Sequence, residues 1–114
     1  MKKDGEFDKT IRKTVNDALS QIFGHTAALI IYDHLEKTNS LTPEEIPKKL
    51  DVFARGLEDF LDSGALVVEK IILKHLYSSY GVEFKENKKD RSFVDNIIQL
   101  KSMVNENTKI TSKT

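Results

Sequence analysis

The chain has 114 residues, and its 18 lysines and arginines balance its 18 aspartates and glutamates. This is the length of a single domain, and a net charge of zero gives no overall attraction to nucleic acid or to anionic lipid. The sequence has no cysteine, which excludes disulfides, thiolate zinc sites and cysteine nucleophiles. No apolar run approaches the roughly 20 residues of a membrane-spanning helix, and none forms a secretory signal near the N-terminus. We therefore expect a cytoplasmic protein without a membrane segment.

The N-terminal part of the chain predicts two helices. Residues 1–6 are polar and are expected to be flexible. Over residues 7–23 apolar side chains recur at every third or fourth position, which predicts an amphipathic helix that Gly24 ends. A second helix should follow, with Thr26 as its N-cap and its end near Lys37. Its apolar arc is wide, so we expect it to be well buried.

A third helix is predicted after a short loop. Residues 42–45, with the sequence TPEE, combine an N-cap, a first-turn proline and the glutamate of a capping box. Pro47 disfavours helical geometry at the residue before it, so we expect a short turn and then a new helix that begins at Pro47. Three acidic residues, Glu58, Asp59 and Asp62, lie near the end of this helix, where its dipole disfavours them. They are interpreted as solvated surface, with contact to a basic partner surface as the alternative.

The most apolar long segment predicts a central helix over about residues 64–80. Ser63 is placed to cap its first turn, and Gly81 can end it in the left-handed conformation, with Val82 folding back onto Tyr77. Apolar residues surround this helix almost completely. We therefore expect neighbouring helices on several of its sides.

The C-terminal part is predicted to be a polar loop at residues 85–91, a helix at 92–105 that Ser92 caps, and a disordered tail at 106–114. No segment shows the sustained alternation of apolar and polar residues that is typical of a strand. The predicted fold class is all-α, a compact bundle of five to six helices around the central helix, with the helical domain proper at residues 7–84.

Two polar residues lie where the helical pattern expects apolar ones. Glu69 falls near the middle of the apolar arc of the central helix, and His34 falls on the apolar arc of the second helix. An ionised carboxylate in a core is costly unless it is paired, hydrated or has a raised pKa. Glu69 and His34 are therefore a candidate buried polar pair. The alternative is that Glu69 reaches solvent at a helix edge or through a crevice.

Motifs for catalysis and for cofactor binding are lacking. We find no phosphate-binding glycine pattern, no local metal motif among the three histidines and no serine in a nucleophile elbow. We therefore expect no enzyme activity, no catalytic residue, no cofactor and no metal. The basic loop at 85–91 is interrupted by Glu86 and Asp90, so nucleic acid is not expected as a partner.

Residues 7–84 resemble a family of small archaeal domains. The matching elements are FG at 23–24, YDHLE at 32–36, EIP at 45–47, SGA at 63–65, and VEK at 68–70 with the YGVEF at 80–84. The family is the one called Nitrosopumilus output domain five, predicted signal-output modules that occur fused to sensory or receiver domains and also as free-standing proteins. None of the matching elements is a catalytic motif. The resemblance therefore implies a fold and a role in signal output, with no active-site residues to carry over.

From these observations we predict a non-catalytic helical interaction or output module in archaeal signal transduction. Its partner would be another protein or a second copy of itself, as in a homodimer. The predicted interaction surface is an apolar stripe on the last helix, formed by Phe93, Ile97, Leu100 and Val104. The alternative is that this stripe packs on the core of its own chain.

Two other functions are compatible with the sequence. One is a DNA-associated transcriptional regulator that uses residues 42–62 or the basic loop. The other is a small-molecule-sensing domain, which would have an apolar pocket near Tyr32, Tyr77 or Glu69.

Overall fold

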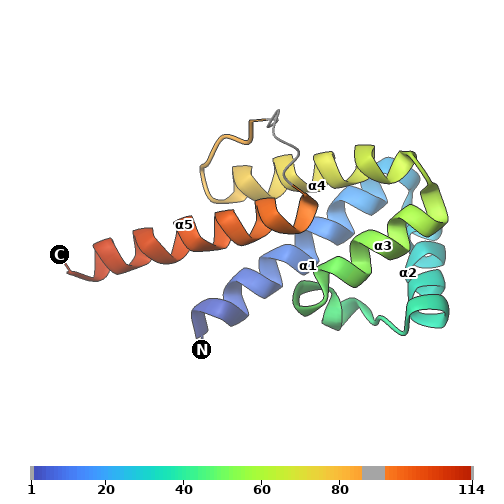
Figure 1. The fold of residues 1–114 in the computed structure, drawn as a ribbon, viewed down its shortest axis with the longest axis horizontal. Coiled ribbons are helices and arrows are strands. Elements are labelled where there is room, and N and C mark those ends of the chain that lie inside the picture. The colour runs from blue at the N-terminus through green and yellow to red at the C-terminus, as the bar shows by residue number, and fades with distance from the viewer. Residues whose placement is uncertain (1, 86–91, 114) are drawn as a thin grey trace.

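The computed structural model describes residues 2–85 and 92–113, and side chains within 5–85 and 92–105. In these ranges the chain forms five α-helices and one 3₁₀-helix, with no strand. The elements are α1 (Lys2–Phe23), α2 (His25–Asn39), η1 (Pro43–Lys48), α3 (Leu50–Leu61), α4 (Gly64–Ser79) and α5 (Phe93–Lys113). The predicted all-α bundle is confirmed (Figure 1). No helix within the described ranges has the length and apolar character needed to cross a membrane.

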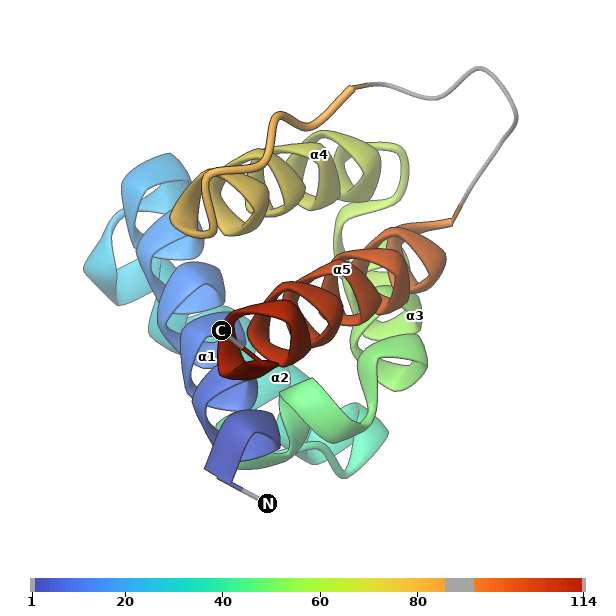
Figure 2. The ribbon, with the colours of Figure 1, turned by 90° about the vertical axis from the view of Figure 1, so that its left-hand side faces the viewer.

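The predicted central helix is α4, and it packs against α1, α3 and α5. α2 packs on α1 and α3, and η1 also packs on these two helices. Figure 2 shows α5 lying alongside α3 and α4. The side chains of Phe53, Ile72 and Leu76 are fully buried where these helices meet. Not every side of α4 is covered, because Leu66 and Val67 in its first turn are 63% and 58% exposed.

The apolar stripe of α5 packs on the core of its own chain. Phe93, Ile97 and Leu100 are buried, and Val104 is half-buried against the same core. Ring centres of Phe93 and Phe53 lie 6.0 Å apart. The prediction that this stripe is an interaction surface is therefore wrong, and the alternative holds. The physical reason is that α3 and α4 present apolar side chains to α5, and burying the stripe against them removes both surfaces from water.

Polar contacts fix α5 at its N-terminal end. Ser92 caps the helix as predicted, because its Oγ accepts a hydrogen bond of 3.0 Å from the Asp95 N–H. Tyr77 of α4 donates its hydroxyl to the carbonyl oxygen of Asn96 over 2.7 Å in the buried interior. Further along the helix, the Lys101 ammonium lies 6.0 Å from the centre of the Phe7 ring of α1.

Two predicted helix ends are confirmed in detail. At the start of η1, an oxygen of the Glu45 carboxylate accepts hydrogen bonds from the Thr42 N–H at 3.0 Å and from the Thr42 hydroxyl at 3.2 Å. The backbone N–H of Thr42 thereby holds the pKa of Glu45 below its usual value. At the end of α4, Gly81 has a φ of 70°, and the Val82 N–H donates to the Tyr77 carbonyl at 3.0 Å.

Two predicted caps are wrong. The N-cap of α2 is Gly24, with a φ of 90°, so Thr26 lies inside the helix. Ser63 precedes α4 but has helical dihedral angles, and its side chain makes no capping hydrogen bond. A side-chain hydroxyl caps a helix only from an extended backbone, which Ser63 does not adopt.

Three boundaries also differ from the predictions. α1 begins at Lys2, within the segment expected to be flexible, and α5 continues to Lys113, through most of the segment expected to be disordered. Adding residues to an existing helix is much less costly than starting one, which favours both extensions. α3 begins at Leu50 because Pro47 stays within η1. Of the predicted polar loop, residues 86–91 lie outside the described residues.

Gly56 of α3 is buried against α2. A Cβ at this position would overlap the side chain of Leu35 and lie 3.0 Å from Oδ1 of Asn39. We predict that Gly56→Ala lowers the free energy of unfolding by about 1–3 kcal/mol, because the buried Leu35 must shift. Gly5→Ala is the matched control, since no atom lies within 4 Å of its added Cβ. It should raise stability by about 0.5–1 kcal/mol. Urea unfolding measures both, and a similar change in the two variants would contradict the close contact.

Candidate functional site

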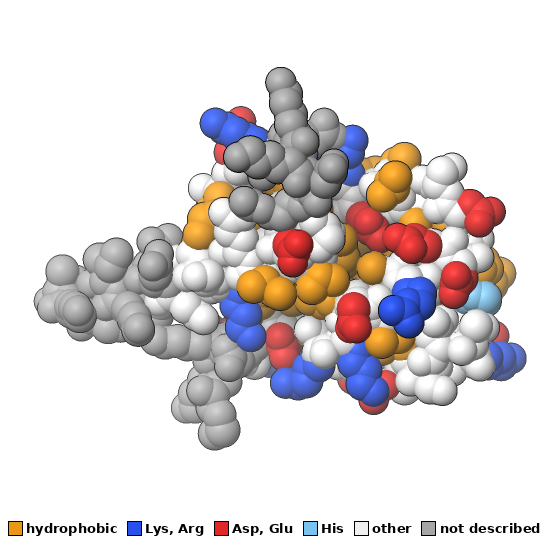
Figure 3. Space-filling model, in the orientation of Figure 1, with side chains coloured by type: hydrophobic (Ala, Val, Ile, Leu, Met, Phe, Trp, Pro, Cys, Tyr) orange, Lys and Arg blue, Asp and Glu red, His pale blue; other side chains and the backbone are white. Residues whose placement is uncertain are grey.

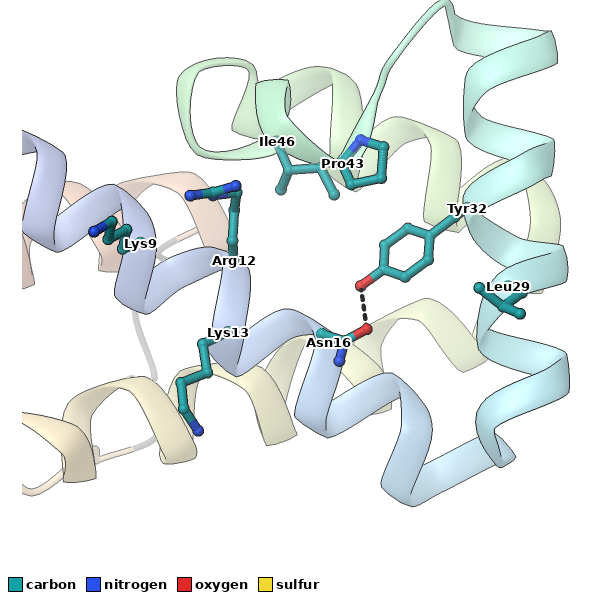
Figure 4. A pocket seen from close by; sticks show the side chains of 8 residues that line it. All are labelled: Lys9, Arg12, Lys13, Asn16, Leu29, Tyr32, Pro43 and Ile46. Atoms are coloured by element: carbon teal, nitrogen blue, oxygen red, sulfur yellow. Dashed lines mark hydrogen bonds between the residues drawn. The ribbon is translucent and has the colours of Figure 1, made fainter.

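An open groove lies between α1, α2 and η1, and we refer to it as the α1–α2–η1 groove. Its volume is about 490 Å³. The lining residues are Lys9, Arg12, Lys13, Asn16, Leu29, Tyr32, Pro43 and Ile46 (Figure 4). Three of these are cations from α1, and none is a carboxylate. The groove thus combines positive charge on one wall with apolar surface on the others.

Each wall follows from a local pattern in the sequence. Lys9, Arg12, Lys13 and Asn16 recur at helical spacing on the side of α1 away from its buried stripe. α2 packs on α1 and presents Tyr32, whose hydroxyl donates to Oδ1 of Asn16 at 3.2 Å. The capped turn of η1 adds Pro43 at the third side. Figure 4 shows the Tyr32 and Arg12 side chains reaching into the space between these elements.

The cations of the groove differ in how they are paired. Lys13 forms an exposed ion pair of 3.2 Å with Asp17, the residue one turn further along α1. Among the described side chains, neither Lys9 nor Arg12 has a carboxylate within 4 Å. Arg12 is half-buried. Its planar guanidinium can donate two parallel hydrogen bonds to a carboxylate or a phosphate, so it is the best-placed group in the groove to bind an anion.

Tyr32 stays neutral at physiological pH. Burial, and to a lesser extent the nearby negative charge of Asp17, raise the pKa of its hydroxyl to about 12. The group therefore acts as a hydrogen-bond donor toward Asn16 and does not cancel the positive charge of Lys9 and Arg12.

The apolar wall comes from a part of α2 that we expected to be buried. Leu29 and Ile30 are 53% and 55% exposed, whereas Ala28, Ile31 and Leu35 are buried. α2 lies at the end of the bundle and packs on α1 and α3 only from one side. No described element covers the remaining half of its wide apolar arc, which corrects the prediction that this helix is well buried.

Glu69 is buried as its position in the pattern suggests, at 7% exposure, but no hydrogen bond or ion pair joins it to His34 within the described part of the chain. Oε2 of Glu69 and Nε2 of His34 are both buried without a partner. The His34 ring instead packs against Phe60 of α3, with ring centres 4.7 Å apart. α2 and α4 both pack on α3. The predicted pair is not formed. Glu69 is not exposed at a helix edge, and its remaining 7% exposure is compatible with the alternative that it reaches solvent through a crevice.

The carboxyl group of Glu69 holds its proton unusually tightly. Burial raises its pKa from 4.5 to about 7, and the negative charge of Glu58 on α3 adds to the rise. At neutral pH the group is thus close to half-protonated. Glu69 lines neither the α1–α2–η1 groove nor the hollow at the end of α4.

Titration of Glu69 should be visible in the stability of the protein. The folded-state pKa lies above the unfolded one, so this group makes the free energy of unfolding fall as the pH rises from 4.5 to 7. The side chain in Glu69→Gln cannot ionise, so the free energy of unfolding of this variant should not show this fall with pH. Between about pH 4.5 and about pH 8, the free energy of unfolding of this variant should rise relative to that of wild type by on the order of 1–2 kcal/mol.

The matched control is Glu58→Gln, which removes only the lesser cause of the raised pKa. Its stability should still fall with pH, but less than that of wild type. Denaturant unfolding across this pH range measures all three proteins. Identical pH profiles for wild type and Glu69→Gln would show that Glu69 ionises freely in the folded state.

Other candidate chemistry is limited in the described residues. There, no three side chains among His, Cys, Asp and Glu come close enough together to hold a metal ion. A second, shallower hollow of about 380 Å³ lies at the end of α4, beside Lys74, Gly81 and Phe84. Of the basic loop proposed for nucleic acid, only Lys85 is described, and it is exposed.

The sequence analysis did not identify the α1–α2–η1 groove. The sequence pattern places the cations of α1 on the polar side of an amphipathic helix and Tyr32 on a buried arc of the next helix. One signal could have pointed to it. The apolar arc of α2 is wider than one side of a helix at the end of a bundle can bury, so part of it had to remain exposed.

Comparison with models of known protein families gives no match, and no curated protein and no solved structure matches the chain. The resemblance of residues 7–84 to the archaeal output family stays a prediction.

Proposed function

We propose that this protein is a non-catalytic helical interaction module that binds a protein partner through the α1–α2–η1 groove. The observation that carries this proposal is the composition of the groove. Lys9 and Arg12 have no carboxylate partner among the described side chains, and they line the same groove as the exposed Leu29 and the half-buried Tyr32.

The make-up of the groove suits a protein segment better than a small metabolite. Tyrosine and arginine are enriched at the energetically dominant positions of protein interfaces, where apolar contacts are surrounded by charged groups. Small-molecule sites usually enclose most of their ligand, whereas this groove is open along its length. The small-molecule-sensing alternative expected an apolar pocket, and the hollow beside Tyr32 has a cationic wall.

We place this module in signal transduction, as a cytoplasmic output domain, on the basis of the resemblance of residues 7–84 to the archaeal output family. The DNA-associated alternative has less support. Its candidate recognition helix, α3, buries Phe53 and Leu57 and exposes Asp51, Glu58 and Asp59. Such a helix would repel the phosphate backbone.

Site-specific photocrosslinking tests the proposed docking site. A photoreactive benzoylphenylalanine in place of Leu29 should form covalent adducts with a protein in an extract of the producing cells. His75, exposed on α4 and outside the groove, is the matched control position. Adducts from position 29 should exceed those from position 75 several-fold, and adding Arg12→Glu should abolish them. Equal yields at the two positions, or no effect of Arg12→Glu, would contradict docking in the groove.

A further inference from the structure

We infer that the partner in the α1–α2–η1 groove is a second copy of this chain, which docks through the acidic end of its α3. The acidic end of α3 consists of Glu58, Asp59 and Asp62, with the Phe60 ring beside them. This inference rests on the proposed function, because it names the partner of the proposed docking site.

The acidic end of α3 is available for contact. Glu58, Asp59 and Asp62 are exposed, and none of them forms an ion pair with a described cation, Arg55 on the same helix included. The carbonyl groups at a helix C-terminus add partial negative charge to such a cluster. Phe60 is 40% exposed and gives the cluster an apolar neighbour. Figure 3 shows acidic and hydrophobic side chains next to one another on the face over α3 and α4.

The acidic end and the groove are complementary in charge and in apolar character. The groove presents Lys9, Arg12 and Lys13 without a carboxylate among its lining residues. Leu29 in its wall is more than half exposed and can receive an aromatic ring. Lys13 is already paired with Asp17. Lys9 and Arg12, however, have no carboxylate partner among the described side chains of their own chain, and the acidic end has no cation partner there. Charges that complement each other in this way orient two proteins on approach.

A chain cannot fill its own groove in this way. Tyr32 lines the groove, whereas His34, two residues further along α2, packs against Phe60 of the same chain. Two residues on an α-helix are separated by about 200°, so the groove and the acidic end lie on opposite sides of α2. The acidic end that enters the groove must come from another molecule.

The overall charge of the protein does not oppose this contact. Positive and negative residues are equal in number, so two copies do not repel one another at long range. The contact is heterologous, with different surfaces on the two partners, and gives a closed ring or an open chain of molecules. It should weaken with salt, because exposed charges are screened over about 10 Å at 0.1 M ionic strength.

Charge reversal on each surface tests this inference. The groove variant carries Lys9→Glu and Arg12→Glu, the end variant carries Glu58→Lys and Asp59→Lys, and the combined variant carries all four changes. Sedimentation velocity over a range of concentrations should show association of wild type that is at least about tenfold weaker at high salt. Each two-residue variant should be monomeric. The combined variant should associate again, because its groove is acidic and its α3 end is basic.

A further variant separates a docking contact from an effect of net charge. Lys37→Glu with Lys74→Glu gives the same net charge as the groove variant but leaves the groove and the acidic end intact. It should associate like wild type. Circular dichroism and thermal unfolding confirm that each variant is folded.

Three results would overturn the inference. They are a monomeric wild type at every concentration at low salt, association of the groove variant that equals wild type, and a combined variant that is folded but monomeric. If wild type is monomeric while position 29 still crosslinks to a different protein, the groove remains a docking site and only its partner has been misidentified. If, in addition, position 29 crosslinks no more than position 75, both the docking site in the groove and the self-association through it are contradicted.

Discussion

Burial of the α5 stripe against α3 and α4 is the interaction on which the rest of the structure depends. The Phe93 ring packs against the Phe53 ring, and the Tyr77 hydroxyl donates a hydrogen bond to the Asn96 carbonyl inside the core. This contact joins the two ends of the chain, since Lys101 of α5 also lies over Phe7 of α1. Because the most regular apolar stripe of the sequence is used within the molecule, any interaction surface must come from what the core leaves uncovered.

The uncovered surface is concentrated at one end of the bundle. α2 packs from one side only, so Leu29 remains exposed next to the cations of α1. The adjacent corner between α3 and α4 carries unpaired carboxylates at its surface and Glu69 beneath it, whose pKa of about 7 is raised by burial and then by Glu58. Thus a protein with no net charge has, among its described side chains, carboxylates without an ion-pair partner on one surface and the cations Lys9 and Arg12 without one on another, although other charges are paired locally.

The sequence was sufficient for features that depend on neighbours along the chain. It predicted the helical fold, the hydrogen bonds between Thr42 and Glu45, and the left-handed Gly81, and it placed Glu69 on an apolar arc without deciding whether it is buried. The sequence was not sufficient for features that depend on which helices pack against each other. A helical wheel gives the apolar face of a helix but not the element that packs on it, so the α5 stripe was assigned to a partner, and the exposed Ile30 was assigned to a buried arc. The groove is formed by three elements together, and the sequence of no single element indicates it.

Native-state hydrogen exchange of the full chain tests most directly that α5 is part of the core. The backbone amides of Ile97 and Leu100 in α5 should open with the same free energy as those of Phe53 and Leu57 in α3, because both sets become exposed only when the whole domain unfolds. If the α5 amides instead exchange with an opening free energy several kcal/mol lower, α5 detaches on its own. The stripe of Phe93, Ile97 and Leu100 would then be available to a partner after all.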